Sequence, residues 1–407
     1  MRAAHPLSPR VPPTLRRLSA LAAVVTLALT IGSCTTGKSD DDPVISSLNA
    51  QEADAAAPEN YRSVKDNGPL STASGTVVMS TSGKNGLKDT VTGDLTTTVV
   101  SRDPSTTRFQ WAVSIKPAAA DQERIKYTGS AQSAMSENMG RSSTGSAVVS
   151  PDGRYLSLFL LPAEQQSGET VADQHTHIIV LDTKTGKTVR DATVSGVVLG
   201  QAITNSALAV ETAQNYFPAG SGKGTIRVFP ITSSGAQESS FSTGQWLIGA
   251  SGKDLLLAPD VPPYECTLDC APYTVTRSGT DGHTIATLPG VTAVHPGGWV
   301  SQYRDPKAAA GFLHTMHASP DNNAATEDAR QKLEMLPKQL VHIDTGQTTD
   351  ITDMTVDERS VPNGLGLVVY QDVSTGEYSR EREPAFWLSA ADDGHPHTEN
   401  LEQFTNN

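Results

Sequence analysis

The chain has 407 residues, a length that ordinarily holds two or three domains. Hydrophobic residues make up 37% of the chain and charged residues 18%. The 33 glycines and 25 prolines favour a turn-rich fold, and they are too few for collagen, which is about one-third glycine. A net charge of −13 argues against a nucleic-acid partner, because phosphate binding needs clustered Lys and Arg, and three cysteines are too few for a disulfide scaffold.

The N-terminal segment has the features of an export signal. Four arginines and no acidic residue precede the apolar run Leu18–Ile31, which is shorter than the roughly 20 residues of a membrane-spanning helix. The run ends at Ile31-Gly32-Ser33-Cys34, which resembles the lipobox of bacterial lipoproteins. The resemblance implies that residues 1–33 are a signal peptide and that Cys34 is lipidated and becomes the mature N-terminus. An ordinary signal peptide followed by an unrelated cysteine is the alternative.

The lipobox resemblance implies a location at the cell membrane, lipid-anchored and facing the extracytoplasmic side. Removal of residues 1–33 takes away four arginines and no acidic residue, which changes the net charge from −13 to −17. Anionic membrane surfaces repel such a chain, so we expect the diacylglyceryl group on Cys34 to hold it there. Arg16-Arg17 is a weak twin-arginine feature, and Sec export is the favoured route.

The segment 34–74 is polar, with stretches such as TTGKSDDDP and EADAAAPENYRS. Its few aliphatic residues, among them Val44, Ile45 and Leu48, show no period. Such a segment buries too little apolar surface to offset the entropy of ordering it. We therefore expect a flexible tether over 34–74 and a folded body over 75–407. The alternative is that part of the segment packs on the body.

The body repeats a two-part unit from about Gly145 onward. Each part is a hairpin, with a turn former such as Asp-Gly or Asn-Gly between β-rich runs. The first hairpin recurs at Ser146–Leu161, Val197–Thr212, Trp246–Pro259, Val291–Tyr303 and Arg359–Asp372. The turns of the second hairpin contain Gly186, Gly235, Gly282, Gly346 and Gly394. The intervals between successive glycines of this series are nearly equal, with one exception, the longer interval from Gly282 to Gly346.

The exception has a local explanation. The interval from Gly282 to Gly346 contains extra sequence between Tyr303 and Gln339. This extra sequence holds the best helical segment of the body, Thr326–Leu336, with Thr326 as a possible N-cap and Pro337 as the stop. We therefore expect a helical insertion near residues 305–338.

A period of roughly 40–50 residues with four strands per unit is typical of a β-propeller, in which a ring of blades buries what one blade cannot. The heptapeptide Ser150–Leu156 (SPDGRYL) resembles the tight turn of TolB-like and WD40-like propellers. The segment Thr76–Ala118 also predicts strands, for one or two irregular blades. The expected fold is all-β: a β-propeller with seven four-stranded blades, six and eight remaining open. A β-sandwich would explain the hairpins but not their constant spacing.

Two cysteines and three histidine pairs are the candidates for disulfide and metal chemistry. With Cys34 lipidated, two thiols remain in an exported protein, so we expect a disulfide between Cys266 and Cys270 in a loop of one blade. A metal pair is the alternative, but two further ligands are missing. The His pairs 175/177, 314/317 and 395/397 have no completing carboxylate pattern. The stretch GSGKGT at 220–225 resembles a nucleotide phosphate-binding loop, but it lacks a Ser or Thr directly after the lysine and a helix after the loop. We therefore predict that the protein holds no metal and no cofactor.

Trp299, Tyr303 and Arg304 are the candidate binding residues. They follow Gly297-Gly298 and precede the insertion. Aromatic residues and Arg are enriched at binding hot spots, and long loops often carry function. Trp299 and Tyr303 also share strand parity, so packing between blades explains them equally well.

These features predict a lipid-anchored extracytoplasmic β-propeller that acts as a monomeric binding or scaffold module in the cell envelope. Its expected partner is an envelope protein or a glycan. No pattern demands a chemical reaction, because no nucleophile elbow is present and the carboxylates are scattered, so catalytic residues stay unassigned. The alternative is an envelope enzyme, such as a glycan hydrolase or lyase, that uses the propeller channel. An enzyme would require converging Asp, Glu, His or Tyr side chains with shifted pKa values.

Overall fold

The computed structural model describes residues 42–56, 70–85, 90–118, 147–160, 173, 175–214, 224–231, 237–259, 272–318, 323–362, 364–374, 380–392 and 394–405. All of them belong to one compact unit, Ser39–Asn407. The lipidation residue Cys34 and the predicted pair Cys266 and Cys270 lie outside the described residues. Within the described part, no helix has both the length and the apolarity needed to cross a membrane.

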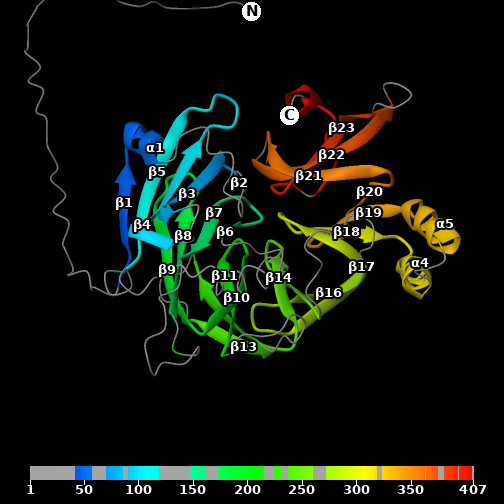
Figure 1. The fold of residues 1–407 in the computed structure, drawn as a ribbon, viewed down its shortest axis with the longest axis horizontal. Coiled ribbons are helices and arrows are strands. Elements are labelled where there is room, and N and C mark those ends of the chain that lie inside the picture. The colour runs from blue at the N-terminus through cyan, green and yellow to red at the C-terminus, as the bar shows by residue number, and fades with distance from the viewer. Residues whose placement is uncertain are drawn as a thin grey trace, which may run out of the picture. The chain divides into compact units, whose positions relative to one another are not determined.

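The described strands form five antiparallel sheets, each built from consecutive segments of the chain (Figure 1). Sheet A has the order β1-β5-β4-β3-β2 and contains β1 (Val44–Leu48), β2 (Leu70–Ser71), β3 (Thr76–Asn85), β4 (Thr90–Arg102) and β5 (Phe109–Lys116). Sheet B follows chain order through β6 (Ala147–Val149), β7 (Tyr155–Phe159), β8 (His175–Asp182) and β9 (Thr188–Ser195). Sheet C does the same through β10 (Val197–Ile203), β11 (Ala207–Ala213), β12 (Gly224–Pro230) and β13 (Ser239–Thr243). Sheet E contains β21 (Met354–Val361), β22 (Gly364–Ser374) and β23 (Arg380–Ser389).

Sheet D has seven strands: β14 (Trp246–Ala250), β15 (Leu255–Ala258), β16 (Tyr273–Ser278), β17 (Thr284–His295), β18 (Trp299–Tyr303), β19 (Lys338–His342) and β20 (Thr348–Asp350). Its long strand β17 serves two neighbours, because residues 284–291 pair with β16 and residues 291–295 pair with β18. Gly290 lies between the two halves with φ 75°, a backbone conformation that favours glycine. Sheet D therefore consists of two four-stranded units, which we call D1 (β14–β17) and D2 (β17–β20).

The repeated hairpins predicted from the sequence are confirmed. The first hairpin of each unit is present as β6–β7, β10–β11, β14–β15, β17–β18 and β21–β22. The second is present as β8–β9, β12–β13, β16–β17 and β19–β20. The constant glycine spacing has a physical cause, since Gly186, Gly282, Gly346 and Gly394 have φ between 68° and 91°. In the last unit only β23 is a full strand, and its expected partner is reduced to one bridge between Trp387 and His397.

The predicted tether is wrong for residues 44–56. Strand β1 pairs along its whole length with β5, and α1 (Ala50–Ala56) buries Ala53 against sheet A. Asn49 and Glu52 form a reciprocal cap at the start of α1, since each side chain accepts a hydrogen bond from the other's backbone N–H, at 3.0 and 2.8 Å. The alternative, that part of this segment packs on the body, is therefore confirmed. The segment shows no hydrophobic period because β1 is a short edge strand at the surface.

Short turns join the first two strands of each unit, and a Ser or Thr side chain closes four of them. The hydroxyl oxygens of Thr72, Ser150, Thr204 and Ser251 accept hydrogen bonds from the backbone N–H groups of Gly75, Tyr155, Ala207 and Asp254, at 2.9 to 3.2 Å. A hydroxyl at the entry of a turn competes well for a nearby backbone donor, which favours Ser and Thr at this position. The predicted SPDG turn is one of these, with Gly153 at φ 68°.

These turns also contact one another from unit to unit. Backbone and side-chain hydrogen bonds join Ala73 N to Gly153 O, Asp152 N to Asn205 Oδ1, and Asn205 N to Gly252 O, each at 3.0 Å. The remaining turns approach one another closely at glycines. Gly298 contacts Ser251, Gly297 contacts Ala390, and Gly364 contacts Ala73, and a Cβ added at each glycine would lie 2.9 to 3.3 Å from its neighbour. The contacts therefore run from sheet A through B, C, D1, D2 and E and return to Ala73 of sheet A.

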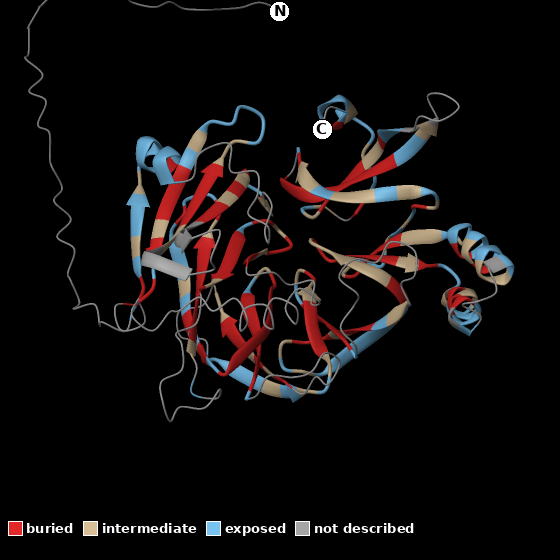
Figure 2. Cartoon of the chain, in the orientation of Figure 1, coloured by how far each residue is buried: buried red, intermediate tan, exposed pale blue. Residues whose placement is uncertain are grey.

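Hydrophobic clusters fill the seams between consecutive units, which Figure 2 shows as buried strands in red. Separate clusters join sheet A to B, B to C, C to D1, D1 to D2 and D2 to E. Among the described residues, no cluster joins sheet E to sheet A. There, the C-terminal segment around Phe404 covers sheet E, and α1 covers sheet A. The first and last sheets instead meet at the short strand β2, which contacts β21 and β22.

Candidate functional site

The two ends of the strands carry connections of very different length. At the end with the capped turns, most connections have two to five residues. At the opposite end, the connections after β7, β11, β15 and β18 are much longer and run over 160–174, 214–223, 259–272 and 304–337. Long connections on a rigid β scaffold are where binding residues usually lie. We call this end the long-connection face.

The longest of these connections contains the predicted helical insertion, which is confirmed. It holds α5 (Asn323–Glu334), near the predicted Thr326–Leu336, and also α4 (Pro306–Ala318), which the sequence analysis missed. Asp305 accepts a hydrogen bond from Ala308 N at 2.9 Å and Pro306 follows it, which is an N-cap signal that identifies α4. The two helices bury Leu313 and Leu333 against each other and against Tyr303.

The three predicted binding residues do not form one surface. Trp299 is fully buried between D2 and sheet E, where its ring centroid lies 4.6 Å from that of His342. Tyr303 is 5% exposed and packs under the helices of the insertion. Arg304 is about half exposed and binds Asp350 at 2.6 Å. The alternative of packing between units therefore fits Trp299, whereas Tyr303 packs against the helical insertion.

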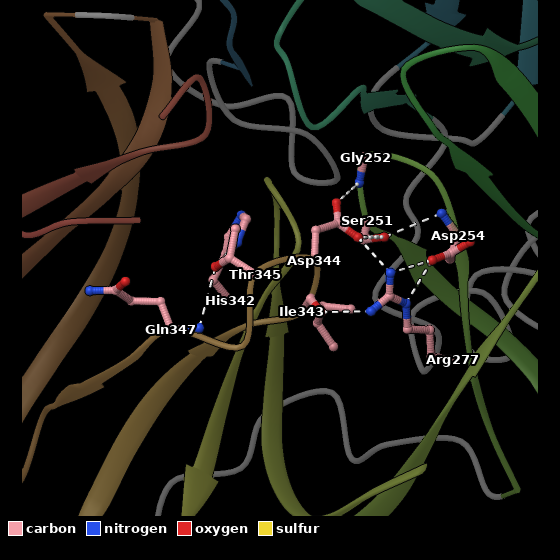
Figure 3. A network of polar contacts seen from close by, with 9 residues as sticks. All are labelled: Ser251, Gly252, Asp254, Arg277, His342, Ile343, Asp344, Thr345 and Gln347. Atoms are coloured by element: carbon pink, nitrogen blue, oxygen red, sulfur yellow. Dashed lines mark hydrogen bonds and ion pairs between the residues drawn. The ribbon is translucent and has the colours of Figure 1, made fainter. Parts of the chain in front are cut away.

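A polar network centred on Arg277 joins D1 to D2 next to the capped turns (Figure 3). The guanidinium donates from Nε to Asp254 Oδ2 at 2.6 Å, from Nη1 to the Ile343 carbonyl at 2.8 Å, and from Nη2 to Asp344 Oδ1 at 3.2 Å. Asp344 in turn accepts from Ser251 Oγ at 2.7 Å and from the Gly252 N–H at 2.8 Å. One arginine and two carboxylates thus clamp three separate chain segments together.

This network suits a structural role. Each charged group in it is paired within hydrogen-bond distance, and Arg277, Asp254 and Asp344 are all mostly buried. Charged groups satisfied in this way rigidify the turns they join, while a catalytic site needs a donor or acceptor directed at a substrate. Sequence reasoning missed the network because its members lie 23 to 93 residues apart along the chain.

A second polar cluster resembles a nucleophile–base pair in its distances. His295 Nε2 lies 2.8 Å from Ser301 Oγ, and His295 Nδ1 lies 3.7 Å from Glu358 of the neighbouring sheet E. Ser301 is buried in β18, which is paired on both sides with β17 and β19. Backbone N–H groups in a central strand are used by the sheet, so they offer no oxyanion hole beside Ser301. The cluster therefore fits a hydrogen-bonded, partly buried histidine better than a catalytic serine.

A third cluster surrounds His397 near the C-terminal end of the chain. His397 stacks on Trp387 with ring centroids 4.0 Å apart, and it binds Asp392 at 2.6 Å and Glu399 at 3.0 Å. Burial of the ring opposes its charge, but these hydrogen bonds outweigh that effect and raise the pKa of His397 above its ordinary value. Over the described residues, no group of three or more His, Cys, Asp and Glu side chains is placed to hold a metal ion.

One carboxylate is buried without an ion-pair partner that the structure describes. Glu211 of β11 is fully buried, and its Oε2 accepts a hydrogen bond from the Leu247 N–H of D1 at 2.8 Å. Its Oε1 has no partner among the described residues. Gly224 leaves the space that this oxygen occupies, since a Cβ there would collide with it. Burial raises the pKa of Glu211 to about 7, although the Leu247 N–H opposes the shift.

Comparisons with known proteins give no family. No family model matches the chain, and no curated protein matches it. Among solved structures, it resembles the β-propeller domain of the Trilobed protease from Pyrococcus furiosus at 13% identity, covering 78% of this chain and 83% of that one, with a TM-score of 0.34. An uncharacterised protein from Listeria monocytogenes matches at 8% identity, covering 82% and 83%, with a TM-score of 0.37.

Some of the similar structures are enzymes. The acylaminoacyl peptidase of Pyrococcus horikoshii matches at 12% identity with a TM-score of 0.35, over 81% of this chain. The chain spans about half the length of that peptidase, 51%. At these low identities and scores, the likenesses assign no activity to this chain.

Proposed function

We propose that this protein is a lipid-anchored extracytoplasmic β-propeller that binds an envelope protein or glycan through its long-connection face. The observation that carries the proposal is the contrast between the two ends of the sheets. At one end, short turns hydrogen-bond to one another in a continuous series. At the other end, the four long connections leave and re-enter the same rigid sheets. A rigid base with long connections at one end is the usual design of a binding module.

The series of turn contacts supports a ring of six blades, fewer than the seven favoured by the spacing. Sheets A, B, C and E count as one blade each, and D1 and D2 count as two. Sheet A supplies one blade where the spacing argument allowed two. The contact of Gly364 with Ala73 brings the last unit back to the first. Each blade then buries both faces against its neighbours, except at the seam between E and A.

The polar clusters around Arg277 and around Ser301 favour binding over catalysis. The ion pairs of Arg277 are directed at other chain segments, and Ser301 is a buried residue of a central strand. An envelope glycan hydrolase or lyase would need a pair of carboxylates facing one substrate-sized space. The role of a rigid binding module needs only the scaffold and the long connections.

Membrane attachment through Cys34 makes a direct prediction. We expect the protein extracted from bacterial membranes to carry a diacylglyceryl group on an N-terminal Cys34, detected as added mass on the N-terminal peptide. The Cys34→Ser variant should appear in the soluble or secreted fraction, because the strongly acidic body has no electrostatic attraction to an anionic surface. Unmodified Cys34 in membrane-extracted protein would contradict the anchor.

The binding face is tested by removing its longest connection. Tyr303 and Lys338 are paired neighbours on β18 and β19, so residues 304–337 can be replaced by an Asn-Gly turn without separating the strands. We expect the shortened protein to keep its fold and lose at least tenfold in affinity for a partner captured from envelope extracts. Circular dichroism checks the fold, and surface plasmon resonance measures the affinity.

A matched control changes the opposite end of the molecule. Lys187→Ala alters an exposed residue of a short turn in sheet B and should leave partner binding unchanged. If the shortened protein binds as tightly as the natural one while the turn variant loses affinity, the binding face has been assigned to the wrong end.

A further inference from the structure

The C-terminal segment, residues 394–405, lies where sheet E lacks a fourth strand. Sheets B, C and D give four strands to each unit, whereas sheet E has three. In the described residues, the segment pairs with β23 through one bridge, in which Trp387 and His397 exchange two backbone hydrogen bonds of 2.9 Å. Farther along, Phe404 is buried against sheet E on the face opposite D2. A chain end held by so few backbone bonds opens more easily than a paired strand, so its side-chain contacts decide whether it stays in place.

His397 lies at the centre of these side-chain contacts. Its ring stacks on the indole of Trp387 with an interplanar angle of 13° and a centroid distance of 4.0 Å. Its Nε2 lies 2.6 Å from Asp392 Oδ2, and its Nδ1 lies 3.0 Å from Glu399 Oε1. The indole Nε1 of Trp387 donates a hydrogen bond of 2.8 Å to the Glu399 carbonyl. Both nitrogens of the imidazole therefore face carboxylate oxygens, and an aromatic ring covers one face of it.

This arrangement fits the protonated form of His397. A neutral imidazole has one N–H group and its other nitrogen is an acceptor, whereas an ionised carboxylate only accepts. A neutral ring would therefore place a lone pair against one of the two carboxylates. The imidazolium donates from both nitrogens, and its charge is attracted to the face of the Trp387 ring. Burial opposes this charge, but the contacts with Asp392 and Glu399 outweigh burial and raise the pKa of His397 above its ordinary value.

Other charged and titratable groups surround the segment. His395 is its second histidine, and His395 Nδ1 lies 3.1 Å from Gln347 Nε2 of D2. The face of sheet E that the segment covers carries four more such side chains, those of Asp357, Arg359, Tyr370 and Arg382. Aspartate and arginine do not ordinarily titrate between pH 6 and pH 9, and burial raises the pKa of Tyr370 above its ordinary value. A change of charge at the segment in this range is therefore a matter of its histidines.

We propose that residues 394–405 form a pH-sensitive clasp, which protonated His397 fastens to sheet E and which loosens when His397 loses its proton. The pKa of His397 is higher in the fastened state than the ordinary value of 6.5 expected in the loose state. Its contribution to fastening is therefore complete below pH 6.5 and is lost as the pH rises through the raised pKa. Loosening exposes apolar surface of sheet E around Val361 and Val368, which the segment covers. The clasp lies on sheet E, away from the connection 304–337 of D2, so its test is independent of the proposed binding face.

The indole N–H of Trp387 reports on the clasp, because it bonds to the Glu399 carbonyl and reaches solvent when the segment loosens. The test labels the four tryptophans of the full-length protein with ¹⁵N and measures by NMR how fast each indole proton exchanges with water at pH 6 and pH 9. Trp111 is the internal reference, since its buried indole also donates to a carbonyl at 2.8 Å. We expect the ratio of the Trp387 rate to the Trp111 rate to rise at least tenfold between the two pH values, the effect of losing a charge-assisted hydrogen bond. An unchanged ratio would overturn the proposal.

Three glutamine variants identify the group responsible. His397→Gln removes the titratable ring, so the ratio should already be raised at pH 6 and should not change further up to pH 9. A pH dependence like that of the natural protein in this variant would contradict the clasp. His395→Gln should keep the pH dependence, and its loss there would assign the effect to the wrong histidine and overturn the proposal. His283→Gln is the matched control, because His283 also contacts a carboxylate, that of Asp281 in a turn of D1, and it should leave the ratio unchanged.

Discussion

The unfolding free energy of this protein should fall by about 3 kcal/mol between pH 4.5 and pH 7 because of Glu211 alone. Its pKa is about 7 in the folded state, whereas a glutamate in the unfolded chain has its ordinary pKa of 4.5, and each unit of pKa difference corresponds to about 1.4 kcal/mol. In this window the unfolded chain has released the proton while the folded chain still holds it. Rising pH therefore favours unfolding, and the effect ends above the folded pKa.

Glu211→Gln tests this, because an amide of the same shape does not titrate. We expect the difference in unfolding free energy between the variant and the natural protein to change by about 3 kcal/mol from pH 4.5 to pH 7, measured by urea denaturation. Glu334→Gln, on the exposed part of α5, is the control and should show no such pH-dependent difference. Parallel stability curves for Glu211→Gln and the natural protein would mean that the buried carboxyl is not protonated.

Trp299→Ala should destabilise the protein by about 3–5 kcal/mol, the usual cost of removing a buried Trp side chain. Trp299 is fully buried in the cluster that joins D2 to sheet E. Gly394 packs directly on its ring, since a Cβ at that glycine would lie 2.6 Å from it. The cavity would therefore open between two units.

The denaturation midpoint in urea measures this effect. Ile285→Ala is the comparison, because Ile285 is an exposed residue of β17 and should cost less than about 1 kcal/mol. Unchanged stability in Trp299→Ala, together with lost partner binding, would return Trp299 to the role of a binding residue. The expected result assigns it to packing between units instead.

The repeat was readable from the sequence for a local reason. Gly186, Gly282, Gly346 and Gly394 adopt positive φ in equivalent turns, so each turn needs glycine at the same place in the unit. In the β-rich runs around these glycines, apolar and polar residues alternate where a strand buries one face, and the residues stay apolar where a strand buries both faces. The insertion was visible as a break in the glycine spacing and as the stop at Pro337. These features depend only on residues close together in the chain.

The N-terminal boundary could not be derived in the same way. Strand β1 pairs with β5, which follows β2, β3 and β4 in the chain, and its own five residues carry no period. Its position depends on an available edge of sheet A, a property of the assembled sheet. Only the Asn49–Glu52 cap was a local signal, and it marks α1 but not the strand before it.

Hairpins, their repetition and the inserted helix followed from the sequence alone, because neighbouring residues set the turns and strands. Three features were decided by the tertiary structure: β17 pairs with strands of two units, Trp299 lies in a seam, and Arg277 clamps three segments. The positions of Trp299 and Arg277 depend on side chains from distant segments meeting, and spacing along the chain carries no information about such contacts.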